Sequence, residues 1–97
     1  MIVLSLSITH EAADWYKKEF DIDDQSYLRF FVRYGFGGQI PGFSLGVGYD
    51  VPDNMFASSN VNGIMFFIEN KDAWYFDGKD LTIQLDDTTR EPKFIYS

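Results

Sequence analysis

The sequence contains no cysteine, and this absence excludes several kinds of chemistry at once. Without a thiol, the chain cannot form a disulfide framework, attack a substrate with a thiolate or bind a metal through thiolates of its own. It also contains a single histidine, so neither a Ser-His-Asp triad nor a two-histidine metal site can be assembled from it with any specificity. We therefore expect a protein that is not an enzyme, and we assign no catalytic residue.

Basic residues and long apolar runs are also scarce. Eight Lys and Arg residues stand against fifteen Asp and Glu residues, and the resulting net charge of −7 opposes contact with a phosphate backbone or an anionic membrane. No apolar run approaches the roughly 20 residues that span a bilayer. Met1–Ile8 is apolar but short and lacks a basic start, so it does not match a signal peptide. We expect neither nucleic acid nor membrane as a partner, and we place the protein in the bacterial cytoplasm.

Large apolar side chains are abundant. The chain has 97 residues, of which 45% are hydrophobic and 19% aromatic, including ten Phe, six Tyr and two Trp. A chain of this length has room for one core, and a composition this apolar is not that of a disordered tail. We therefore expect a single domain over residues 1–97.

Residue periodicity predicts a mostly β (α+β) fold with one helix near the N-terminus. Thr9 is a good N-cap, Glu11 suits the positive end of the helix dipole, and apolar residues recur at helical spacing up to Phe20. Alternating or continuously apolar segments predict the strands, which are Met1–Leu6, Tyr27–Arg33, Phe43–Val51, Ile64–Glu69, Leu81–Leu85 and Phe94–Tyr96.

Two connecting segments are predicted less simply. Residues 52–63 form a polar connection, and the segment Ala73–Phe76 is either one side of a hairpin or a short turn of helix. In the strand Phe43–Val51, Gly46 and Gly48 share one side, which we expect to meet another backbone closely.

Four of the eight glycines lie in the loop from Tyr34 to Gly42. The loop lacks the Lys-Ser/Thr of a phosphate-binding loop and is not followed by a helical pattern, so the pattern argues against a nucleotide site. Its amides could still cradle an anion. We favour a tight turn in which Gly42 requires a positive φ.

The strand before this loop carries a candidate contact face. Arg29, Phe31 and Arg33 share one side of it, and Arg and aromatic residues are enriched at protein interfaces. Trp15, Trp74, Tyr75 and Tyr96 can add exposed aromatics or belong to the core, and the sequence leaves both readings open. The candidate binding residues are Arg29, Arg33, Tyr34, Gly37, Gly38, Gly42 and Phe43.

Acidic clusters and the lone histidine give weaker signals. The run Asp21–Asp24 lacks the glycine and glutamate spacing of an EF-hand loop, so we interpret it as a solvated turn. Asp86 and Asp87 precede two threonines and are typical of turn chemistry. His10 stands at the start of the helix, where we expect a surface residue.

Several segments in order resemble the HesB/IscA-like family of iron–sulfur cluster biogenesis. They are Ile8–Ala13, Leu28–Val32, Gly42–Gly46 and Tyr75–Gly78 followed by Leu81–Ile83, and the resemblance covers nearly the whole chain. It implies a compact β-sandwich or pseudo-barrel with one N-terminal helix. The family's cysteine ligands would fall near Ile40 and at or beyond Phe94–Ser97, where this chain has none, so a cluster-binding role is not carried over.

The resemblance implies a non-enzymatic accessory or binding protein, a link to iron–sulfur metabolism, no cofactor and no metal ligand. We expect a protein partner, with the chain itself a monomer or a homodimer. An alternative is a metal carrier that uses tyrosine or carboxylate oxygens, such as those of Asp50, Asp53, Asp86 and Asp87. A third reading, an enzyme working through carboxylates, would require a concave pocket with a perturbed acid.

Overall fold

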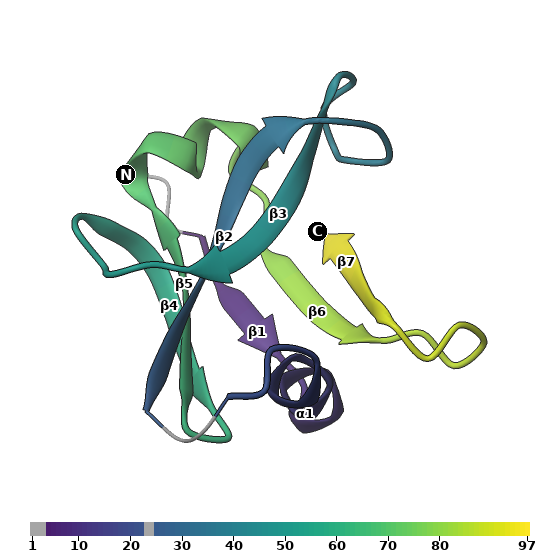
Figure 1. Ribbon diagram of the computed structural model, residues 1–97. Coiled ribbons are helices and arrows are strands. Elements are labelled where there is room, and N and C mark those ends of the chain that lie inside the picture. Colours follow the sequence, from purple (N-terminus) through teal and green to yellow (C-terminus); the bar gives the residue numbers. More distant parts are fainter. Residues whose placement is uncertain (1–3, 23–24) are drawn as a thin grey trace.

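Two β-sheets and an N-terminal helix form the structure, a computed structural model that describes residues 4–22 and 25–97 (Figure 1). The elements in chain order are β1 (Leu6–Ile8), α1 (His10–Glu19), β2 (Ser26–Tyr34), β3 (Phe43–Tyr49), β4 (Met55–Val61), β5 (Ile64–Glu69), the 3-10 helix η1 (Asn70–Phe76), β6 (Leu81–Leu85) and β7 (Pro92–Tyr96). The mostly β prediction is confirmed, and η1 is a second helix that the prediction did not count.

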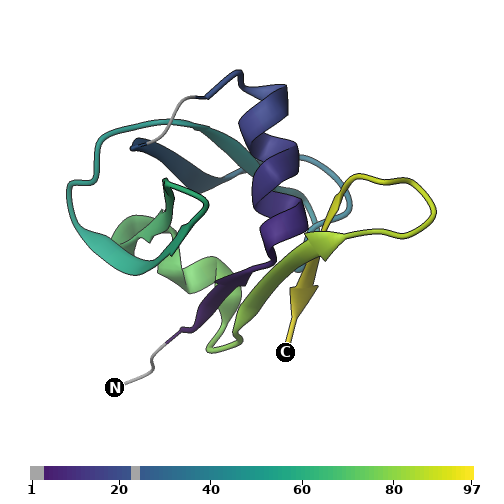
Figure 2. The same ribbon diagram turned by 90° about the horizontal axis from the view of Figure 1, so that it is seen from below.

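The larger sheet has the strand order β3-β2-β5-β4, and the smaller sheet has the order β1-β6-β7. In the larger sheet β2 and β5 are parallel, while β3 and β4 pair antiparallel at the two edges. In the smaller sheet β1 is parallel to β6, and β7 is antiparallel to it. Figure 2 shows β1 running directly into the foot of α1, so the helix connects the two sheets.

The helix α1 forms as its sequence predicts. The Thr9 hydroxyl accepts a hydrogen bond from the Ala12 amide at 3.2 Å, which caps the first turn, and Phe20 follows the last turn. The buried face consists of Ala12, Ala13 and Tyr16. The Tyr16 ring packs on Phe30 and Phe66 of the larger sheet, and the helix also lies against β6 of the smaller sheet.

One hydrophobic cluster draws on both sheets, α1 and η1. Strand β5 contributes Phe66 and Ile68 to this cluster. Phe67, on the other face of the strand, is also fully buried, which confirms a strand covered on both faces. The rings of Phe30 and Phe66 stack with centroids 5.8 Å apart.

The predicted polar connection over residues 52–63 is wrong, because most of it forms strand β4. This edge strand pairs only with β5, and its small polar residues hide the alternation that marks a half-buried strand. The turn between β4 and β5 did carry a signal. Asn62 and Gly63 have φ values of 53° and 80°, as an Asn-Gly hairpin turn requires.

Smaller corrections concern the ends of elements. Strand β1 begins at Leu6 rather than Met1, and residues 1–3 of the predicted strand lie outside the described residues. Strand β3 ends at Tyr49 rather than Val51. Of the two readings for residues 73–76 the helical turn is right, and it ends where Asp77 takes a left-handed φ of 52°.

The small side of β3 meets a side chain rather than a backbone. A Cβ atom added to Gly46 would lie 2.7 Å from the Phe31 ring, so the glycine makes room for that ring. Gly48 borders the same ring. The prediction of a close approach is therefore correct in place but wrong in partner.

Candidate docking surface

Three aromatic rings connect the β2–β3 hairpin to η1. The Tyr34 and Phe43 rings stack with centroids 5.4 Å apart, and the Phe43 and Trp74 rings meet edge to face at 5.3 Å. Tyr34 is 87% exposed and Trp74 is 53% exposed. We call these three residues the aromatic row. Its two ends face solvent, whereas residues of this kind in a core would be covered.

Phe36 lies beyond the row, in the loop of residues 35–42 that joins β2 to β3. This loop projects past both sheets at the upper right of Figure 1. Phe36 is 98% exposed, and Gly37 beside it has a φ of 84° that a side chain would strain. A phenylalanine left in water forgoes the roughly 1.5–3 kcal/mol that burial of such a ring provides. The loop thus presents an apolar group outward.

Gln39 fixes the base of this loop to η1. Its backbone amide donates to the Tyr75 hydroxyl at 2.7 Å, and its side-chain Nε2 donates to the carbonyl oxygens of Tyr75 at 3.1 Å and Phe76 at 3.0 Å. Within the loop, the Gly35 amide donates to Gly42 O at 3.2 Å. The base of the loop is therefore held in place while Phe36 stays free.

The Tyr75 hydroxyl, which accepts the hydrogen bond from the Gln39 amide, lies in the interior. Tyr75 is fully buried, and its oxygen lies 3.4 Å from the hydroxyl oxygen of Tyr96. Burial and the bond to Tyr75 raise the pKa of Tyr96 above its ordinary value. The Tyr96 hydroxyl therefore stays neutral near neutral pH.

Charge is absent from this part of the chain. The sequence from Tyr34 to Tyr49 contains no charged residue, although charged residues make up 24% of the chain. Arg33, the residue before this segment, is exposed. The surface formed by the aromatic row and the loop is therefore apolar and uncharged within an acidic protein.

The structure brings most of the predicted binding residues together. Arg33, Tyr34, Gly37, Gly38, Gly42 and Phe43 all lie on the hairpin end or its loop. A side chain at Gly38 would collide with Phe43 O and the Tyr75 hydroxyl, and Gly42 has a φ of 87°. These glycines shape the loop, as the tight-turn reading expects. The binding role of these residues stays a prediction.

Arg29 does not belong to this surface. Its guanidinium donates to Asp50 at 3.0 Å and to Asp72 at 2.7 Å, and its side chain is only 13% exposed. Burial alone would lower the pKa of Arg29, but the hydrogen bonds with Asp72 and Asp50 outweigh it and raise the pKa. The sequence placed Arg29 on the same strand face as Arg33. It could not show that two carboxylates, distant in the chain, bind the Arg29 guanidinium.

Sequence reasoning missed Phe36 and Gln39. Phe36 had a signal, since a phenylalanine between two glycines in an uncharged loop has no neighbours to bury it. Gln39 had none, because its partners on η1 are more than thirty residues away in the chain. Trp74 was named as an aromatic that could be exposed, whereas Tyr75 belongs to the core and Trp15 and Tyr96 are partly buried against it.

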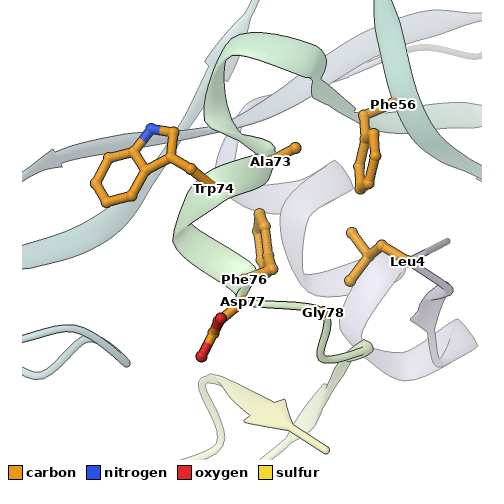
Figure 3. A pocket seen from close by; sticks show the side chains of 7 residues that line it. All are labelled: Leu4, Phe56, Ala73, Trp74, Phe76, Asp77 and Gly78. Atoms are coloured by element: carbon orange, nitrogen blue, oxygen red, sulfur yellow. The ribbon is translucent and has the colours of Figure 1, made fainter. Parts of the chain in front are cut away.

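A small apolar pocket of about 330 Å³ lies beside the aromatic row (Figure 3). It is lined by Leu4, Phe56, Ala73, Trp74, Phe76, Asp77 and Gly78. In Figure 3 the side chains of Leu4, Phe56 and Phe76 gather around it, while the Asp77 carboxylate points away from them. Among the described residues that line the pocket, Asp77 is the only ionisable one, so they do not provide the pair of groups that acid–base chemistry requires.

The carboxylates proposed as metal ligands do not form a metal site. In the part of the chain that the structure describes, no group of three or more His, Asp or Glu residues could hold a metal ion. Asp50 bonds to Arg29, and Asp86 accepts from the amides of Thr88 and Thr89 at 2.8 and 3.0 Å. Asp86 is thus a turn residue, as its position before two threonines indicates.

His10 takes part in a structural contact between α1 and the β4–β5 turn. It is exposed, and its Nδ1 lies 2.7 Å from Asn62 Oδ1. Asn62 Nδ2 donates to His10 O and to Asp14 Oδ1. The prediction of a surface residue at the helix start is confirmed, and its side chain helps to hold the hairpin turn against the helix. Asp23 and Asp24 of the predicted turn lie outside the described residues.

No family model and no solved structure matches the chain. A protein of Bacillus subtilis named pyruvate dehydrogenase inhibitor is 42% identical over 94 residues, which span 96% of this chain and 99% of the relative. The chain belongs to the family of this inhibitor. Uncharacterized proteins of Staphylococcus saprophyticus and Staphylococcus epidermidis are each 30% identical, over 87% and 96% of this chain and 90% and 97% of their own lengths.

These relatives correct the assignment made from the sequence. The HesB/IscA-like resemblance is wrong, because no family model supports it and the named relative carries a different function. The predicted link to iron–sulfur metabolism and the alternative of a metal carrier are therefore wrong as well. The expectation of a bacterial protein that is not an enzyme agrees with a family whose named member is called an inhibitor, and so does the expectation of a protein partner.

Among the described helices, none is long and apolar enough to cross a membrane.

Proposed function

We propose that the chain is a protein inhibitor that binds a pyruvate dehydrogenase and lowers its activity. The observation that carries this proposal is the 42% identity to the Bacillus subtilis inhibitor over nearly the full length of both chains. The match covers 96% of this chain, so it includes both sheets and the loop between β2 and β3. A binding surface on any of these elements could therefore be common to the two proteins.

The surface chemistry supports binding as the mode of action. A chain without cysteine has no thiolate with which to modify an enzyme covalently. It does expose aromatic rings in one region, and aromatic residues are enriched where proteins contact each other. The inhibition should therefore be reversible and should saturate when each binding site on the enzyme is filled.

The test is an inhibition assay with purified components. Pyruvate oxidation by pyruvate dehydrogenase from the same organism is measured while the chain is added up to a several-fold molar excess. We expect activity to fall as the chain is added and to return on dilution. A lactate dehydrogenase assayed in parallel controls for general effects. Unchanged pyruvate oxidation at saturating chain, with no complex on gel filtration, would refute the proposal.

Three further predictions accompany this function. We propose that residues 1–97 act as one domain, because one hydrophobic cluster draws on both sheets. A cytoplasmic location stays a prediction that suits a metabolic enzyme as partner. The state of the free chain, monomer or homodimer, is likewise left to measurement by light scattering.

A further inference from the structure

We infer that the loop of residues 35–42 is the inhibitory element, and that it inserts Phe36 into an uncharged apolar pocket of the enzyme surrounded by a positively charged rim. This inference rests on the proposed function. It names the part of the chain that carries the inhibition and the chemistry of the surface that receives it.

The first support is the exposure of Phe36. Its ring is 98% exposed, although most of the other phenylalanines are buried or packed against the core. The neighbours Gly35 and Gly37 have no side chains that could shield the ring. Interface residues that dominate binding are typically aromatic groups that fill a pocket on the partner.

The second support is the rigidity of the loop base. Gln39 holds the base to η1 through three hydrogen bonds, and the stacked rings of Tyr34 and Phe43 flank it. A loop that is already ordered loses less conformational freedom when it binds. The backbone that carries Phe36 is therefore ordered before the partner binds.

The third support is the distribution of charge. The segment Tyr34–Tyr49 is uncharged, so a pocket that receives it must lack charges, which would lose their hydration without gaining a partner. The chain as a whole is acidic, with a net charge of −7, so a positively charged surface around the pocket favours the approach of the two proteins. The same charge argues against a second copy of this chain as the occupant.

The test compares two exposed aromatic residues on the same hairpin. Phe36→Ala removes the ring at the loop, and Tyr27→Ala removes a 45% exposed ring at the opposite end of β2. We expect Phe36→Ala to raise the half-inhibitory concentration at least about 30-fold, the loss typical of a dominant interface residue. Tyr27→Ala should change it less than about 3-fold. Equal melting temperatures for both variants and the unchanged chain exclude unfolding as the cause.

The rim is tested by salt. Raising NaCl from 50 to about 300 mM shortens the range of electrostatic attraction, so the half-inhibitory concentration of the unchanged chain should rise several-fold. Activity is expressed at each salt concentration relative to the uninhibited enzyme at that concentration. Inhibition that is indifferent to salt, or stronger at high salt, would overturn the positive rim.

The outcomes separate this inference from the proposed function. If the unchanged chain inhibits and Phe36→Ala inhibits equally well, the loop is not the inhibitory element, and the proposed function stands. If the unchanged chain does not inhibit or bind, the proposed function fails and this inference fails with it. A loss confined to Phe36→Ala, together with salt sensitivity, supports both.

Discussion

At the scale of single residues, Gly42 tests the geometry of the loop. Its φ of 87° lies in the left-handed region, which a β-branched side chain rarely adopts. Gly42→Val should therefore destabilise the fold by about 1–3 kcal/mol, which corresponds to a melting temperature roughly 5–15 °C lower. Thermal unfolding followed by circular dichroism measures the change.

The matched control is a glycine without this constraint. Gly48 lies in β3, and a Cβ atom there would meet the Phe31 ring at an ordinary contact distance of 3.7 Å. Gly42→Ala should lower the melting temperature clearly, whereas Gly48→Ala should change it little. Equal effects of the two alanines would show that backbone conformation is not what Gly42 supplies.

Arg29 gives the second prediction at this scale. It neutralises Asp72, whose side chain is only 10% exposed, so its loss leaves a nearly buried carboxylate without a partner. Arg29→Met should lower the free energy of unfolding by on the order of 3 kcal/mol in urea titrations. The methionine keeps most of the volume over the Phe31 ring, so a cavity contributes little to this loss.

The double variant Arg29→Met/Asp72→Asn identifies the cause. If an unpaired charge is responsible, the neutral amide should restore part of the lost stability, even though a second native group has been removed. A double variant less stable than Arg29→Met alone would mean that packing around Arg29, rather than charge, dominates.

At the scale of elements, the β2–β3 loop and η1 depend on each other through Gln39. Gln39→Ala removes two side-chain hydrogen bonds to η1 but leaves Phe36 in place. We expect faster amide hydrogen exchange in residues 35–42 and inhibition several-fold weaker, because a loosened loop must be ordered on binding. The melting temperature should fall by roughly 10 °C, since each of the two bonds contributes about 1 kcal/mol.

The control for this element is Gln84→Ala, which makes the same change in β6 of the other sheet. It should leave both the exchange of the loop and the half-inhibitory concentration unchanged. If Gln39→Ala inhibits as well as the unchanged chain despite faster exchange, rigidity of the loop does not contribute to binding.

The same elements show what the sequence can and cannot predict. Helix α1 was predictable from Thr9 to Phe20, because its cap and apolar face are local patterns. Strand β4 was not, since an edge strand of small polar residues looks like a loop until β5 is known to lie beside it. The contact of Phe43 with Trp74 joins residues thirty-one positions apart, and no spacing along the chain indicates it.

At the scale of the whole molecule, fifteen acidic residues outnumber eight basic ones. Two of them support the fold in their ionised form. The Arg29 guanidinium lowers the pKa of Asp50 below its ordinary 3.8, and the amides of Thr89 and Thr88 do the same for Asp86. These bonds hold the end of β3 to β2 and close the turn between β6 and β7.

Acid should therefore weaken the protein. Because both pKa values are lower in the folded state, the unfolded chain binds more protons as the pH falls below about 4, and the stability from these carboxylates, complete at higher pH, is lost. Urea titrations at pH 7, 5 and 3 should show little change in the free energy of unfolding between the first two and a clear fall at the third.

The controls are Asp50→Asn and Asp86→Asn, in which a neutral amide replaces the carboxylate that takes up a proton on acidification. Each variant should be less stable than the unchanged chain at pH 7 yet lose less stability on acidification. If both variants fall as steeply as the unchanged chain, other carboxylates govern the acid response.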